Sequence, residues 1–176
     1  MVKDSGTVDP GHHRRWIRCD RTRQGLTWFA AYATHLLVRN PAIVRHYYTR
    51  AEAFYRSART LFEDAPHRPS VGLLTVHSAI ALADALLVAE HGSRCRDEDH
   101  SVAATSLEKI CSARRVDSAG VKHFRALLAR KSKFAYGEDS VRDEEYTMAK
   151  TKMEQFFKWV YATFPYLQQL SEVTDA

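Results

Sequence analysis

A short run of cations stands where a helix is expected to end. The stretch RKSKFAYGE, residues 130–138, places Arg130, Lys131 and Lys133 within about one helical turn and follows them with Tyr136. Arginine and lysine donate hydrogen bonds to phosphate oxygens, so this pattern predicts a phosphate-binding helix end. The helix dipole also favours cations near a C-terminus, which accounts for one or two of them without any ligand.

Basic residues continue upstream and widen this candidate surface. Residues 114–133 contain seven cations against Asp117 alone: Arg114, Arg115, Lys122, Arg125, Arg130, Lys131 and Lys133. His123 precedes Arg130 by two turns, about 10 Å along a helix axis, so the two could line one groove but not hold one phosphate oxygen. With a net charge of +5, the pattern favours RNA or a nucleotide bound through Arg125, Arg130, Lys131, Lys133 and His123. A solvated charged face is the alternative.

A second polar line runs along the most apolar segment of the chain. Ser70, His77, Asp84 and His91 recur every seven residues, which places them on one narrow side of a helix. His77 and Asp84 are therefore predicted to line a groove, although an ordinary exposed stripe on a core helix would show the same spacing.

The segment HGSRCRDEDH, residues 91–100, contains histidine, cysteine and aspartate side chains that can bind zinc. Their spacing matches no zinc motif, so a polar loop between helices is favoured. The chain also lacks a Gly-rich phosphate loop, an H-E-x-x-H motif and a nucleophile elbow. We therefore expect no metal and no cofactor.

Length and composition favour one soluble domain. The 176 residues are 45 % hydrophobic and 27 % charged, as in an ordinary globular protein. We expect a basic N-terminal extension over residues 1–40, a bundle over 41–165 and a tail over 166–176. The apolar run 26–38 is shorter than a membrane span requires. Three cysteines without a C-x-x-C pair, Cys19, Cys95 and Cys111, favour the reducing cytoplasm.

Helical periodicity positions these side chains on five expected helices, over residues 41–63, 70–92, 99–113, 118–136 and 141–164. Gly92 is expected to end the second helix, Gly137 to adopt a left-handed cap, and Ser140 to cap the last helix. The first helix is expected to bury Ile43, Tyr47, Ala51, Phe54, Ala58 and Leu61. The chain is thus predicted to be all-α, an up-and-down bundle of four to five helices.

The order of these elements resembles the HEPN domain family (higher eukaryotes and prokaryotes nucleotide-binding). The resemblance covers residues 44–164 and consists of the segments YRSARTLFEDAPHRPS, LLTVHSAIALADALLVAEHG, EDHS and RKSKFAYGE in sequence. It implies a HEPN-like bundle that binds nucleotide or RNA and forms a homodimer.

The resemblance also implies what chemistry to look for. Many HEPN proteins are metal-independent ribonucleases in which an arginine stabilises charge on a phosphate and a histidine four to six residues later moves protons. Arg130 matches that arginine, whereas the histidine window contains Ala135, Tyr136 and Gly137. Tyr136 takes the histidine's place, and a phenol is a weak base at neutral pH. We expect a binding domain with a degraded catalytic motif, Arg130 and Tyr136. The alternatives are an active endoribonuclease toxin with a nucleotidyltransferase partner that modifies Tyr136, and a non-catalytic dimerisation module.

Overall fold

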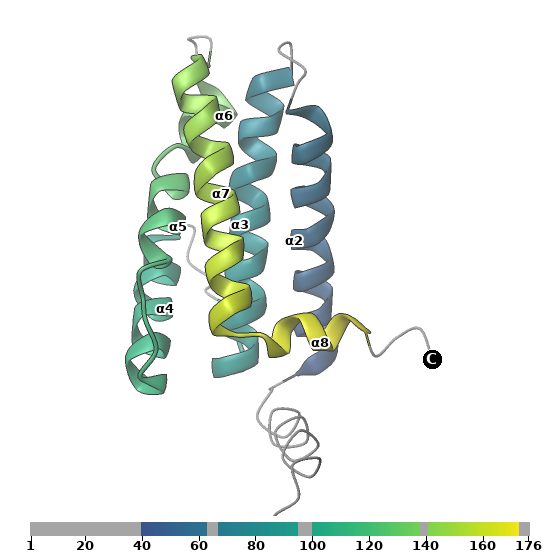
Figure 1. The fold of residues 1–176 in the computed structure, drawn as a ribbon, viewed down its shortest axis with the longest axis vertical. Helices are drawn as coiled ribbons and strands as arrows, with labels where there is room; N and C mark the ends of the chain where they lie inside the picture. Colours follow the sequence, from purple (N-terminus) through teal and green to yellow (C-terminus); the bar gives the residue numbers. More distant parts are fainter. Residues whose placement is uncertain (1–39, 63–66, 95–99, 138–140, 173–176) are drawn as a thin grey trace, which may run out of the picture.

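The computed structural model of the chain describes residues 40–62, 67–94, 100–137 and 141–172, and side chains up to residue 169. The helices are α2 (Pro41–Leu61), α3 (Arg68–His91), α4 (Ser101–Arg114), α5 (Val121–Leu128), α6 (Lys131–Tyr136), α7 (Asp143–Thr163) and α8 (Tyr166–Glu172) (Figure 1). No strand occurs in these residues, so the prediction of an all-α bundle is confirmed. The predicted extension over residues 1–40, except for Asn40, and the Ser140 cap lie outside the described residues.

Helix α3 is the central helix of the bundle, because it is apolar around its whole circumference. Helices α2, α4, α5, α6 and α7 all contact it. It is long and apolar enough to cross a membrane, but 83 % of its most apolar window is buried by the other helices, as in a core helix. Gly92, with φ of 82°, ends it as the sequence predicts.

The buried face of α2 differs from the predicted one. The fully buried positions are Val44, Tyr48, Ala51 and Ala58, whereas Ile43 is 47 % exposed. The sequence contains two overlapping sets of apolar residues one position apart, and packing against α3 and α7 selects between them. Tyr48 and Tyr55 meet the rings of Tyr161 and Phe157 on α7, and this contact sets the rotation of the helix.

The expected single helix over residues 118–136 is wrong: α5 ends at Leu128, and α6 begins at Lys131. Residues 129 and 130 form a turn without proline or glycine. The break lets α6 set Phe134, 5 % exposed, against Gly72 of α3, where a Cβ would lie 2.5 Å from the ring. Gly137 is also extended, with φ of −65°, and not left-handed as predicted.

Helix α7 follows the prediction closely. Asp143, Glu144 and Glu145 occupy its first turn, where the helix dipole favours anions. The predicted inner residues Ala149, Met153, Phe156, Val160 and Phe164 are all buried. Pro165 follows, but residues 166–172 form α8 instead of a tail, and α8 crosses the foot of α2 (Figure 1). Tyr166 donates to Glu90 Oε1 at 2.5 Å and fixes this helix to the bundle.

Candidate functional site

The α6 helix end, residues 130–136, is largely occupied by contacts within the protein. Arg130 lies in the break before α6, and its Nη1 donates to the carbonyl oxygen of Ala126 at 3.2 Å. Lys133 Nζ donates to Glu145 Oε1 at 2.6 Å, and this bond lowers the pKa of the Glu145 carboxyl. Tyr136 is 85 % exposed. Two of the three cations therefore cap a helix or fasten α6 to α7.

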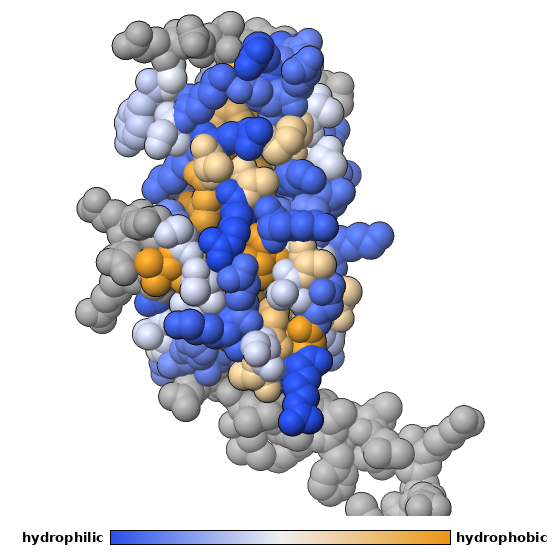
Figure 2. Space-filling view, turned by 90° about the vertical axis from the view of Figure 1, so that its left-hand side faces the viewer, coloured by the Kyte–Doolittle hydropathy of each residue, from blue (hydrophilic) through white to orange (hydrophobic). Residues whose placement is uncertain are grey.

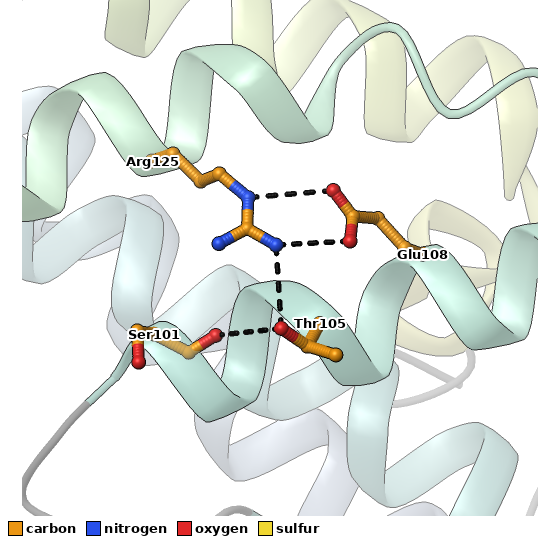
Figure 3. A network of polar contacts seen from close by, with 4 residues as sticks. All are labelled: Ser101, Thr105, Glu108 and Arg125. Carbon is orange, nitrogen blue, oxygen red and sulfur yellow. Dashed lines mark hydrogen bonds and ion pairs between the residues drawn. The ribbon is translucent and has the colours of Figure 1, made fainter.

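Arg125 is likewise engaged within the protein (Figure 3). Its Nε and Nη2 donate to the two carboxylate oxygens of Glu108 at 3.3 and 2.9 Å, and Nη2 also donates to Thr105 Oγ1 at 3.3 Å. Thr105 in turn donates to the Ser101 carbonyl oxygen. A guanidinium held by both oxygens of a carboxylate is neutralised, so this network joins α4 to α5 and offers little to a phosphate.

His123 does not join these cations in one site. It is half-buried, and its Nδ1 has no hydrogen-bond partner among the described residues. Burial, and then Lys152 and Lys122, lower its pKa. It stands two positions from Arg125, which places the two side chains on opposite sides of α5. Figure 2 shows the α4–α5 side of the molecule, where hydrophilic residues predominate and hydrophobic ones are exposed between them. The predicted RNA-binding residues therefore do not converge.

A pocket of about 250 Å³ lies elsewhere, between α2 and α3, and we call it the α2–α3 pocket. It is lined by Tyr47, Arg50, Phe54, His77, Ile80, Ala81, Asp84, Arg94 and His100. The two residues predicted to line a groove, His77 and Asp84, are both in its wall. The polar line on the apolar helix thus opens onto a concave surface.

The antiparallel packing of α2 and α3 decides which side chains meet in this pocket. The Phe54 and His77 rings lie 6.1 Å apart, and Asn40 Nδ2 donates to the Gly92 carbonyl oxygen at 3.2 Å. These two contacts fix the register of the antiparallel helices. Tyr47 precedes Phe54 by seven residues and Asp84 follows His77 by seven, so Tyr47 lies opposite Asp84. The Arg50 guanidinium lies 5.5 Å from the centre of the Phe54 ring. Each end of the pocket therefore pairs an aromatic ring with a titratable side chain.

Asp84 is unusual among the buried polar side chains of α3. Thr75 and Ser78 donate to carbonyl oxygens of their own helix, at 2.6 and 2.8 Å. Asp84 is only 7 % exposed and has neither a hydrogen bond nor an ion pair among the described residues. Burial raises the pKa of Asp84 to about 6, while Arg94 and Arg50 act in the opposite direction. A buried carboxylate that faces a pocket without a donor is costly, and such groups mark binding sites.

Positive charge also acts on the His77 end of the pocket. Burial, followed by the charges of Lys131 and Arg50, lowers the pKa of His77, so its imidazole is neutral at pH 7. Lys131 is one of the predicted cations, and its charge acts on His77 although its side chain is not part of the pocket wall. Arg50, Arg94 and Lys131 form no ion pair with a carboxylate in the described part of the chain. The arrangement can bind an anion and offers a neutral imidazole and a carboxylate beside it.

Sequence reasoning missed most of this wall. The sequence pattern assigns Tyr47 and Phe54 to the core and His100 to the possible zinc ligands of the 91–100 segment, and it gives Arg50 and Arg94 no role. The available signal was the spacing of His77 and Asp84, which matches the seven-residue spacing of Tyr47 and Phe54 on the preceding helix. No group of three potential metal ligands occurs among the described residues, while Cys95, Asp97 and Asp99 of the 91–100 segment lie outside them.

Comparison of the chain with protein-family models, with curated proteins and with solved structures returns no match.

Proposed function

We propose that this helical bundle binds a nucleotide or RNA, with the α2–α3 pocket as the place of phosphate contact. The observation that carries the proposal is the pair of guanidinium groups in the pocket wall, Arg50 and Arg94, which form no ion pair with a carboxylate among the described residues. The Lys131 charge acts on His77 in the same wall. Asp84 is the single acidic residue of the wall within the described part of the chain. The local excess of positive charge favours an anion, and guanidinium groups suit phosphate.

The aromatic residues of the wall favour a nucleotide over a bare phosphate. Tyr47 and Phe54 are half-buried, so part of each side chain is accessible. Stacking of a base on such a ring contributes about 1–3 kcal/mol and tolerates any base. The pocket volume of about 250 Å³ suits one nucleotide unit, either free or within a strand.

Nucleotide or RNA binding is also what the resemblance to the HEPN family implies, and the all-α bundle is compatible with it. The proposal places the main phosphate contact in the α2–α3 pocket and not at Arg130. Lys131 remains a contributing cation, because its charge acts on His77. A homodimer and a nucleotidyltransferase partner stay predictions, as does a role for Tyr136 as the modified residue.

A ribonuclease is the second candidate, because Tyr136 follows Arg130 and Lys133 closely in the sequence and is 85 % exposed, so it is accessible to a substrate. Cleavage by such a site requires Arg130 to leave the Ala126 carbonyl oxygen. Incubation of RNA with the protein in excess chelator tests this. Tyr136→Phe should abolish any cleavage while binding persists, and intact RNA throughout would refute the enzyme.

The binding proposal is tested by fluorescence anisotropy with a labelled single-stranded RNA at low salt. Arg50→Ala should weaken binding by about 1–3 kcal/mol, the cost of losing a charge-assisted contact. Arg56→Ala is the matched control, since Arg56 stands on the same helix outside the pocket with its side chain 80 % exposed. Affinity should also fall steeply with added salt.

Arg130→Ala distinguishes the two possible locations. A pocket site predicts unchanged affinity, whereas a site at the α6 helix end predicts a loss of about 1–3 kcal/mol. If Arg130→Ala weakens binding and Arg50→Ala equals Arg56→Ala, the phosphate site lies at the helix end. If the wild-type protein binds neither RNA nor mononucleotides at low salt, the proposal fails.

A further inference from the structure

The two ends of the α2–α3 pocket are complementary to different chemical groups of a ligand. His77 and Asp84 stand two turns apart on α3, about 10 Å along the axis. The Arg50 guanidinium lies 5.5 Å from the centre of the Phe54 ring, and that ring lies 6.1 Å from His77, so an anionic group belongs at the His77 end. The Lys131 charge also acts on His77. The Asp84 end presents a carboxylate that is 7 % exposed and has no donor among the described residues. A complementary ligand therefore carries an anion at one end and hydrogen-bond donors at the other.

The donors facing Asp84 must be neutral. A cationic donor would meet Arg50 and Arg94, whose charges already act on Asp84. A metal ion would find one carboxylate, since the described residues contain no group of three potential ligands. Neutral N–H groups satisfy the carboxylate without adding positive charge to a cationic pocket.

Among nucleobases, guanine fits this carboxylate best. Its N1–H and exocyclic N2 amino group lie side by side and can donate to both oxygens of one carboxylate. Adenine and cytosine offer one amino group beside an acceptor nitrogen, and uracil places its N3–H between two carbonyl oxygens that repel a carboxylate. We infer that the α2–α3 pocket selects a guanosine phosphate, with Asp84 accepting from the guanine edge and Arg50 facing the phosphate. The inference rests on the proposed function.

The register of the two helices places a ring where this base needs one. Because α2 and α3 are antiparallel and Phe54 meets His77, Tyr47 stands at the Asp84 end of the pocket. A guanine held by its edge on Asp84 can stack on Tyr47, while Phe54 and Arg50 stand at the phosphate end. The two-turn separation is comparable to the extent of one mononucleotide.

Calorimetric titration with GMP, AMP, CMP and UMP at pH 7.5 tests the inference. We expect GMP to bind at least about tenfold more tightly than the other three, since a bidentate contact to a base is of that order. Asp84→Asn should remove the preference, because an amide has one acceptor oxygen where the carboxylate has two. Glu154→Gln, which neutralises an exposed acid on α7, is the control and should retain it.

A second pair of ligands separates base from phosphate. Guanosine should bind more weakly than GMP, and Arg50→Ala should reduce the affinity for GMP by a larger factor than the affinity for guanosine. A single-stranded RNA with one guanosine, compared with the same strand carrying adenosine there, shows whether the site takes guanylate from a strand or only as the free nucleotide.

The outcomes distinguish this inference from the proposed function. Equal affinity for all four mononucleotides, with loss in Arg50→Ala, overturns the guanine preference and leaves nucleotide binding intact. A GMP preference that persists in a folded Asp84→Asn variant also overturns the inference. Binding of no mononucleotide and no RNA refutes both.

Discussion

Two cationic regions of this molecule differ in what their charges touch. At the α6 helix end, Arg130 binds the Ala126 carbonyl oxygen and Lys133 binds Glu145, both inside the protein. Around the α2–α3 pocket, Arg50 and Arg94 act on the Asp84 carboxylate without forming an ion pair with it, and Asp84 is buried with no hydrogen-bond donor among the described residues. The denser cluster in the sequence is thus the better neutralised one. Unsatisfied groups in a concave wall indicate a ligand more strongly than local charge density does.

The largest expected effect is a loss of stability when the contact that anchors the α6 helix end is removed. Phe134→Ala removes the ring that seats α6 on Gly72 and should lower the free energy of unfolding by about 3 kcal/mol. Tyr136→Ala, an aromatic truncation on the same helix at an 85 % exposed position, should change it by less than about 0.5 kcal/mol. Urea unfolding measures both, and equal effects would show that α6 is not anchored through Phe134.

The next prediction concerns the pocket, where a substitution is expected to raise the free energy of unfolding. Burial raises the pKa of Asp84 from 3.8 to about 6, so ionising it costs folded-state stability. That cost is absent below about pH 4, grows between pH 4 and 6, and is constant above. Asp84→Asn should therefore stabilise the protein at pH 7 by up to about 3 kcal/mol and have little effect at pH 4. Thermal unfolding at the two pH values, with Glu154→Gln alongside, checks this; destabilisation by Asp84→Asn at pH 7 would contradict it.

Gly72→Ala should affect both the α6 helix end and the α2–α3 pocket. A Cβ at Gly72 would lie 2.5 Å from the Phe134 ring, so α6 must shift. Overpacking costs about 1–3 kcal/mol, and the higher helix propensity of alanine offsets about 1 kcal/mol of it, so we expect a net loss of about 1 kcal/mol. The shift should also move Lys131 relative to His77 and weaken RNA binding. Ser70→Ala, at an exposed position of α3, should do neither.

The smallest expected effect belongs to Arg125. Its side chain and that of Glu108 are 41 % and 45 % exposed, so their coupling in a double-mutant cycle should be about 0.5 kcal/mol and fall with salt. Arg125→Ala should leave nucleotide affinity unchanged, because the network of Figure 3 occupies this guanidinium. If Arg125→Ala weakened nucleotide binding as much as Arg50→Ala, the binding surface would lie on α5.

The sequence by itself determined the features that depend on local pattern. Period and composition predicted an all-α bundle, the central burial of α3, its end at Gly92 and the inner face of α7. The seven-residue spacing of His77 and Asp84 also predicted that they share one side of a helix. These properties follow from the helical repeat and from glycine's access to positive φ, which need no knowledge of distant residues.

The tertiary structure alone decided the features that depend on which helices meet. The break at residues 129–130 has no proline or glycine to announce it, and it follows from the fit of Phe134 against Gly72. The partners of Arg125 and Lys133 lie 17 and 12 positions away, and Tyr47 reaches the Asp84 end only through the register of α2 on α3. Ion-pair partners and pocket walls are set by long-range packing, because residues far apart in sequence become neighbours only when the apolar faces close on one another.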